Sequence, residues 1–226
     1  MKIPSVIIAI ALLAEKETGV SQSFVNLNFE SANLSGYSPG SQNVPIKSAL
    51  SGWSGYFLTS TITNQATQVW CDGMSLGGYA ISVNDTNNGF GPVIPLQGKY
   101  STYLFGGSGN VSARISQTGL VPGGTKTLLM DVNQYFGFGV TLGGQTINMV
   151  PLQTFSNYTL YGGDISLFSG QLAQLSITAP PTSVPNAVLL DDIVFSTQAI
   201  PEPSSLALLG VGALLLGFFR RRNSSR

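Results

Sequence analysis

The sequence FGFGVTLGGQTINMV, residues 136–150, alternates apolar residues with small or polar ones on both sides of a glycine pair. An alternation with a period of two residues is typical of a β-strand that is buried on one face. Gly143 and Gly144 fit a two-residue turn, because such turns need a positive φ angle at both central positions. The stretch therefore predicts a β-hairpin.

The turn also decides which residues of the hairpin face each other. It places Val140 opposite Ile147 and Phe138 opposite Met149, so that both apolar pairs lie on one face. A slip of one residue would turn this face to water, and the register is therefore well specified. We expect the face that carries these pairs to contact the core.

The rest of the chain favours β-structure as well. Only 9% of its residues are charged, 43% are hydrophobic and 27 are glycine, a composition typical of strands joined by tight turns. Strands are predicted at residues 80–83, 101–105, 111–115, 125–132, 171–179 and 187–197. The second and third of these flank a glycine-rich turn, which predicts another hairpin. We expect no helix within residues 22–199 and interpret them as one domain, an antiparallel all-β sandwich.

The charged and nucleophilic residues exclude several classes of function. Residues 22–199 carry seven acids and four bases, a net charge of −3, with no basic patch for nucleic acid. The chain has no histidine and one cysteine, which excludes a Ser-His-Asp triad, a Cys-His pair and a histidine metal site. We interpret the cysteine, Cys71, as a small buried apolar residue. No two carboxylates are paired by the sequence pattern, and we expect that the protein is not an enzyme.

The N-terminus has the order of a secretory signal peptide. Lys2 precedes an apolar run, residues 3–14, and a polar stretch, residues 15–22. The run is too short for a transmembrane helix, and Gly19-Val20-Ser21 offers a small-x-small cleavage site. We expect residues 1–21 to form a signal helix that the Sec translocon recognises and that is then removed. The alternative is an N-terminal helix of the mature domain.

The last 26 residues combine three features in a fixed order. The motif Pro201, Glu202 and Pro203 precedes an apolar run, residues 204–219, which ends at Arg220, Arg221 and Arg222. Sixteen residues are marginal for a transmembrane helix, but a thinner bilayer can accommodate them. Because positive charge beside a hydrophobic segment stays cytoplasmic, the body of the protein is expected on the other side of the membrane.

These three features together resemble the PEP-CTERM sorting signal of Gram-negative bacteria, over residues 201–226. The resemblance implies recognition by exosortase, a membrane protease-transpeptidase that cuts near Pro-Glu-Pro and releases the body or attaches it to surface material. It also implies anchoring in the inner membrane in transit and a final location at the cell surface or outside, among extracellular polysaccharide and biofilm. The alternative is a plain C-terminal membrane anchor.

The two ends of the predicted domain resemble another family. The segment FVNLNFE, residues 24–30, opens the domain as a strand, and VLLDDIVF, residues 188–195, closes it. Together they are similar to galactose-binding-like jelly rolls, the fold of many carbohydrate-binding modules. The resemblance implies a structural calcium ion held by Glu30 and Asp192, and less so by Asp191, because neighbouring residues of a strand point to opposite faces. The alternative is that these are solvated acids at a strand end.

These observations favour a binding or structural protein over an enzyme. We expect a structural or adhesive role in the envelope or the exopolysaccharide, with weak carbohydrate binding. Sugars stack on exposed aromatic rings, and the candidates are Tyr79, Tyr158 and Trp53, although Trp53 also fits a core position. The alternative function is a secreted polysaccharide-processing hydrolase, which needs two carboxylates that face each other in a cleft.

Overall fold

The computed structural model describes residues 22–73, 78–86, 95–107, 109–134, 136–181 and 186–200. The predicted signal helix, the predicted transmembrane helix at residues 204–219 and the Pro-Glu-Pro and arginine residues of the sorting signal lie outside these ranges. Within them, no helix has both the length and the apolar character needed to cross a membrane.

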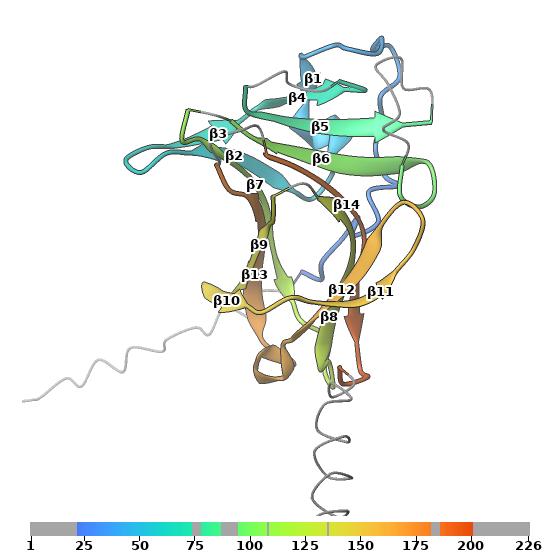
Figure 1. Ribbon diagram of the computed structural model, residues 1–226, viewed down its shortest axis with the longest axis vertical. Coiled ribbons are helices and arrows are strands. Elements are labelled where there is room, and N and C mark those ends of the chain that lie inside the picture. Colours follow the sequence, from blue (N-terminus) through green and yellow to red (C-terminus); the bar gives the residue numbers. More distant parts are fainter. Residues whose placement is uncertain are drawn as a thin grey trace, which may run out of the picture.

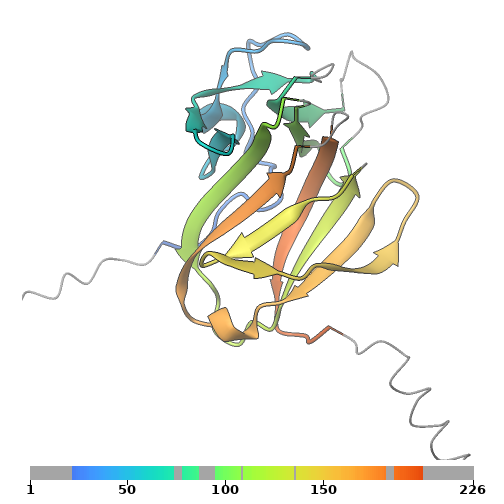
Figure 2. The ribbon, with the colours of Figure 1, turned by 60° about the vertical axis from the view of Figure 1, so that its left-hand side comes forward.

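Two β-sheets build the domain, which confirms the prediction of an all-β sandwich (Figures 1 and 2). The larger sheet contains, in spatial order, β1 (Val44–Pro45), β4 (Gln68–Cys71), β5 (Ala80–Asp85), β6 (Tyr100–Gly106), β14 (Asn186–Ser196), β8 (Thr127–Gln134), β12 (Thr159–Asp164) and β11 (Val150–Thr154). The smaller sheet contains β10 (Gln145–Ile147), β9 (Gly139–Leu142), β13 (Leu172–Ala179), β7 (Ser112–Leu120), β2 (Ser54–Leu58) and β3 (Thr63–Ala66). The expectation of no helix within residues 22–199 is wrong at two single turns, α1 (Ile46–Ala49) and the 3₁₀ turn η1 (Ser166–Phe168).

The hairpin predicted at residues 136–150 is present as β9 and β10. Val140 is paired with Ile147, as expected, and Gly143 and Gly144 have φ angles of 57° and 79°. Phe138 and Met149 lie just outside the ladder and pack half-buried against the core. The core-facing side of the hairpin is thus confirmed.

The six other predicted strands are present as β5, β6, β7, β8, β13 and β14, but the predicted hairpin between β6 and β7 is wrong. Both edges of β6 are occupied, one by β5 and the other by β14. The chain therefore turns at Gly107, whose N–H donates to Val111 O (2.9 Å), and β7 enters the smaller sheet. The sandwich is also not entirely antiparallel, since β4 and β5 run parallel.

The opening strand expected at residues 24–30 is absent. Asn26 and Phe29 have positive φ angles of 51° and 58°, so the backbone turns instead of extending. Side chains take the place of a ladder: Gln117 Oε1 accepts from Val25 N (2.6 Å). The segment still reaches the closing strand, because Ile193 N donates to Leu27 O (3.0 Å).

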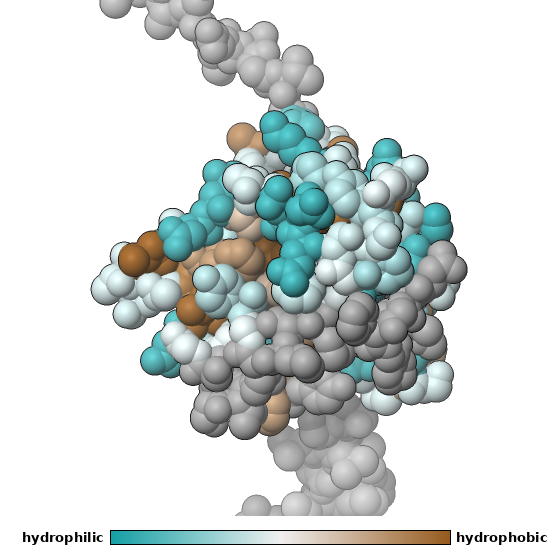
Figure 3. All heavy atoms as spheres, turned by 90° about the horizontal axis from the view of Figure 1, so that it is seen from above, coloured by the Kyte–Doolittle hydropathy of each residue, from teal (hydrophilic) through white to brown (hydrophobic). Residues whose placement is uncertain are grey.

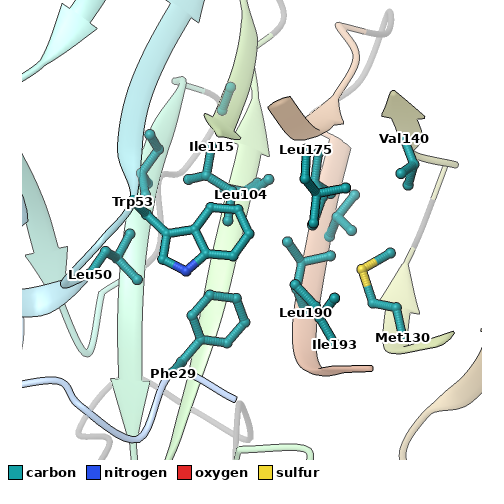
Figure 4. Close-up of a cluster of buried hydrophobic side chains, with 14 of the residues drawn as sticks. Phe29, Leu50, Trp53, Leu104, Ile115, Met130, Val140, Leu175, Leu190 and Ile193 are labelled. Carbon is teal, nitrogen blue, oxygen red and sulfur yellow. The ribbon is translucent and has the colours of Figure 1, made fainter. Parts of the chain in front are cut away.

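The main core fills the space between the two sheets (Figure 4). It combines residues of the smaller sheet, Ile115 and Leu175, with residues of the larger sheet, Leu104, Met130 and Leu190, all fully buried. A smaller cluster covers the other face of the larger sheet and contains Ala80, Leu96, Tyr103, Phe105, Ala187 and Leu189, with Trp70 and Tyr158 packed against it. The larger sheet is therefore buried on both faces where β6 and β14 meet.

Gly143→Ala should lower the free energy of unfolding by about 1–2 kcal/mol, since a left-handed backbone costs a residue with a Cβ about that much. The new Cβ would also lie 2.9 Å from Phe168 Cε1. Gly139→Ala, in the same hairpin, places its Cβ in open space and should change the free energy of unfolding by less than about 0.5 kcal/mol. Urea unfolding of both variants measures the difference, and equal losses would contradict the turn geometry.

Candidate functional site

Two aromatic rings stand at the tip of the hairpin that joins β11 and β12, on the right of Figure 1. Phe155 N donates to Tyr158 O (2.8 Å), which closes a four-residue turn. The turn brings the two rings side by side, with centroids 4.6 Å apart and planes inclined by 26°. Phe155 is exposed and Tyr158 is half-buried, so the tip offers a broad aromatic surface.

A hollow of about 380 Å³ lies beside these rings. Aromatic and amide side chains dominate its walls, namely Phe155, Tyr158, Tyr161, Asn133, Gln134 and Asn157. A neighbouring hollow of about 390 Å³ reaches the β9–β10 hairpin and is lined by Phe138, Thr146, Asn148 and Met149 among others. Gln134, Gly137 and Tyr161 line both hollows. The two hollows are therefore adjacent, and we call them together the aromatic groove.

Gln134 lies at the junction of the two hollows. Its Nε2 donates to the Tyr161 hydroxyl (2.8 Å), whereas its Oε1 is buried without a hydrogen-bond partner among the described residues. Gly137 keeps the space beside this oxygen open, since a Cβ there would lie 3.9 Å from it. A buried carbonyl oxygen without a donor costs about 1–3 kcal/mol. The oxygen is closed to solvent, so a ligand hydroxyl could donate to it only after the Gln134 side chain moves.

Amide side chains fix the hairpin tip to the body of the domain. Asn133 Nδ2 donates to Asn157 O (2.8 Å), and Asn157 Nδ2 donates to Leu96 O (3.3 Å). Gln97 Nε2 donates to the Tyr158 hydroxyl (2.8 Å). The two stacked rings are thus held at their positions before any ligand binds, which lowers the entropic cost of binding.

Two acids lie beneath the groove, on the outer face of the larger sheet. Asp131 of β8 and Asp191 of β14 are directly opposite each other, which places their Cβ atoms about 5 Å apart. Both side chains are buried. Gln97 contacts both: its N donates to Asp191 Oδ2 (3.1 Å) and its Nε2 to Asp131 Oδ2 (3.3 Å). One glutamine therefore joins the acid pair to Tyr158.

Burial changes the titration of this acid pair. Desolvation raises the pKa of Asp191 to about 7, and hydrogen bonds from Ser101 Oγ, Asp192 N and Gln97 N oppose this shift. Desolvation also raises the pKa of Asp131, against the hydrogen bond from Gln97. A substantial fraction of Asp191 is therefore protonated at neutral pH.

Another contact between acids, also not visible in the sequence pattern, joins Asp72 and Asp85. Asp85 N donates to Asp72 Oδ1 (2.6 Å), and both residues are buried. Cys71 is buried beside them, and desolvation, followed by the charge of Asp72, raises the pKa of its thiol to about 12. The interpretation of Cys71 as a buried residue is confirmed. Neither pair of acids lines the aromatic groove.

The three aromatic candidates from the sequence lie in three different places. Tyr158 lines the groove. Tyr79 is 49% exposed and packs on Phe57 (4.7 Å between centroids), near the β2–β3 hairpin. Figure 3 views that end of the molecule and shows apolar side chains among polar ones. Trp53 is in the core, where its Nε1 donates to Asn26 O (3.0 Å), and it presents no open ring face.

Sequence reasoning missed most of the groove. Phe155, Tyr161 and Gln134 were not candidates, although the stretch TFSNYT, residues 154–159, carries a usable signal. Two aromatic residues there flank a Ser-Asn pair that favours a turn, which brings both rings to one hairpin tip. Tyr161 and Gln134 join them only through the pairing of β12 with β8.

The residues implied for calcium have defined positions. Glu30 Oε1 accepts from Lys99 N (2.7 Å) and Tyr100 N (3.0 Å) and so anchors the loop before β6. Asp192 is exposed, with a φ of 42°, in a β-bulge of β14. Across the described ranges, no three acids or cysteines are grouped so that they could hold a metal ion. A calcium ion held by Glu30 and Asp192 stays a prediction, and no step of the function is built on it.

Comparison with known proteins finds the PEP-CTERM protein-sorting motif at residues 199–223, which confirms the resemblance in the tail. The protein is therefore exported, anchored in a membrane in transit and then located at the cell surface. No curated protein matches the chain.

A comparison with solved structures finds weak likenesses only. TmCBM61 in complex with beta-1,4-galactotriose is 13% identical, with 76% of this chain and 95% of that chain covered and a TM-score of 0.42. A beta-glucosidase from Kluyveromyces marxianus in complex with glucose is 11% identical, with 71% and 18% covered and a TM-score of 0.29. An anti-sigma factor domain-containing protein from Clostridium clariflavum is 14% identical, with 66% and 45% covered and a TM-score of 0.28. With TM-scores below 0.5, these likenesses carry no weight for fold or function.

The melting temperature should fall as the pH rises from about 4 to about 8, in part because of Asp191. A carboxyl group whose pKa is raised by folding stabilises the folded state below its unfolded pKa, and this contribution is lost as the pH rises through the folded value of about 7. Asp191→Asn should flatten the fall, as measured by thermal unfolding across this pH range.

Asp164→Asn is the matched control. Hydrogen bonds from Ser166 lower the pKa of this exposed acid, so its contribution is present at neutral pH and lost as the pH falls. Its replacement should leave the fall between pH 4 and pH 8 at least as steep as in the wild type. If Asp191→Asn left the fall of the melting temperature between pH 4 and pH 8 unchanged, this result would contradict the proposed titration of the buried pair.

Proposed function

We propose that the domain is a non-enzymatic surface protein with a structural or adhesive role, and that it binds polysaccharide weakly in the aromatic groove. The observation that carries this proposal is the stacked pair Phe155–Tyr158 beside the amide side chains that line the hollow. Sugar rings pack their C–H faces on aromatic rings, and their hydroxyls bond to amides. The open shape of the groove suits a chain more than an enclosed small molecule.

The acid pair is the one observation that favours the alternative, a hydrolase. Asp131 and Asp191 lie directly opposite each other on paired strands, as two cooperating carboxyls could, and a raised pKa suits a general acid. Both side chains are buried, however, and Gln97 lies across them. A glycosidic bond in the groove would not reach either carboxyl. This geometry supports binding without cleavage.

The proposal also includes the fold family of the domain and its export to the cell surface. A galactose-binding-like jelly roll is supported by the contact between the opening and closing segments, Ile193 N to Leu27 O. The sorting motif supports export through the Sec translocon and processing by exosortase in a Gram-negative bacterium. Release or attachment at the surface would then bring the groove among the polysaccharides of a biofilm.

Phe155→Ala should weaken binding to the recognised glycan about two- to tenfold, since the loss of one stacked ring costs about 0.5–1.5 kcal/mol. The glycan would first be identified by screening residues 22–200 on a glycan array, with and without calcium. Tyr79→Ala is the control, because it removes an exposed ring far from the groove in the fold. No bound glycan in either condition would contradict the binding role and leave the structural one. Equal losses in both variants would contradict the site.

Replacement of Pro201, Glu202 and Pro203 by alanine should keep the protein in the membrane with Arg226 intact, because the motif that exosortase recognises is lost. The wild-type protein, collected from the cell surface, should end near Pro201. Intact-mass spectrometry measures both. Wild-type surface protein that retains Arg226 would contradict exosortase processing.

A further inference from the structure

The folded domain holds the chain until just before the Pro-Glu-Pro residues of the sorting motif. Lys126 N donates to Ser196 O (2.8 Å), and Thr127 Oγ1 donates to Gln198 O (2.7 Å). Ala199 and Ile200 line a hollow of about 220 Å³ together with Lys126, Asp164 and Ser166. The tail therefore leaves the domain at Ile200, next to the turn η1.

The chain between the domain and the apolar run is short. Six residue steps join Ile200 to Leu206, the first apolar side chain of the run after Ser204 and Ser205. A chain of that length spans at most about 20 Å. The polar layer on each side of a bilayer is about 5–8 Å thick. While the tail is anchored, the end of the domain from which it leaves must lie close to the lipid.

Among the described residues, the two large apolar side chains with the greatest exposed fraction lie at this same end. Leu167 of η1 is 78% exposed and Leu172, at the start of β13, is 63% exposed. Figures 1 and 2 place η1 and the end of β14 at the same end of the molecule. Ser166, which precedes Leu167, lines the hollow that holds Ile200.

The turn that presents these leucines is firmly held. Gln171 Nε2 donates to Leu167 O (2.6 Å), and Gly170 N donates to Val121 O (3.1 Å). Gly124 N donates to Ser169 Oγ (2.7 Å). Leu167 and Leu172 are thus exposed by a fixed backbone, although burial in lipid would be favourable for both side chains.

We propose that the end of the domain around Leu167 and Leu172 contacts the lipid bilayer while the protein is anchored. The contact is apolar, because the charges of Lys126 and Asp164 at this end balance each other. Two leucines bury far less apolar surface than the acyl chains needed for stable membrane attachment. The contact therefore orients the domain in transit and does not oppose its release after the tail is cut. It is independent of glycan binding in the groove.

The test uses the full chain, anchored by its own tail in phosphatidylcholine vesicles that contain bromine-labelled lipid, a quencher of fluorescence. Leu167→Cys carries an environment-sensitive fluorophore. Ile62→Cys is the matched control, because Ile62 is also exposed (54%) but lies at the β2–β3 hairpin. Wild-type protein serves as the blank, since Cys71 is buried and should take up no label.

Lipid contact predicts several-fold stronger quenching at position 167 than at position 62. Equal quenching at the two positions would overturn the proposal, as would a chain that does not float with the vesicles. The vesicles contain no exosortase. A surface that contacts only the enzyme would therefore give equal quenching and would also count against lipid contact.

Discussion

Strand β14 is hydrogen-bonded to two different neighbours, and the rest of the molecule is arranged around it. Its first half lies between β6 and β8, whereas beyond the bulge at Asp191 and Asp192 it keeps only β8 as a strand partner. On the side that β6 leaves, Ile193 bonds to the N-terminal segment at Leu27. A bulge bends a strand and increases its twist. The two ends of the larger sheet consequently run in different directions in Figure 1.

The same bulge connects the acids to the groove. It buries Asp191 and leaves its neighbour Asp192 in water. Gln97 then serves both the buried carboxylates and Tyr158, so the acid pair and one of the two stacked rings belong to one hydrogen-bond network. Networks of this kind have a fixed geometry when all members are satisfied. Among the described residues, Gln134 Oε1 is buried without a hydrogen-bond partner, as are Thr102 Oγ1 and Arg114 Nε.

Local patterns in the sequence predicted local structure well. The glycine pair and the alternation around it led to the correct β9–β10 register, and the buried position of Cys71 agrees with its interpretation as a small apolar residue. The patterns led to wrong predictions where contacts between distant segments of the chain determine the structure. The occupied edges of β6 prevent the hairpin with β7, and side-chain contacts of Gln117 and Trp53 replace a strand at residues 24–30. The groove was missed for the same reason, because Gln134 and Tyr161 meet only across the paired strands β8 and β12.

The burial of Cys71 has a consequence for life outside the cytoplasm. It is the single cysteine of the chain, so the exported domain is held together by packing and hydrogen bonds, without a covalent cross-link. Its stability should not depend on whether the surroundings are oxidising or reducing. Because the thiol is enclosed and mostly protonated, it is also protected from forming disulfides with neighbouring molecules. Neighbouring copies at a cell surface therefore form no disulfides with one another as long as they are folded.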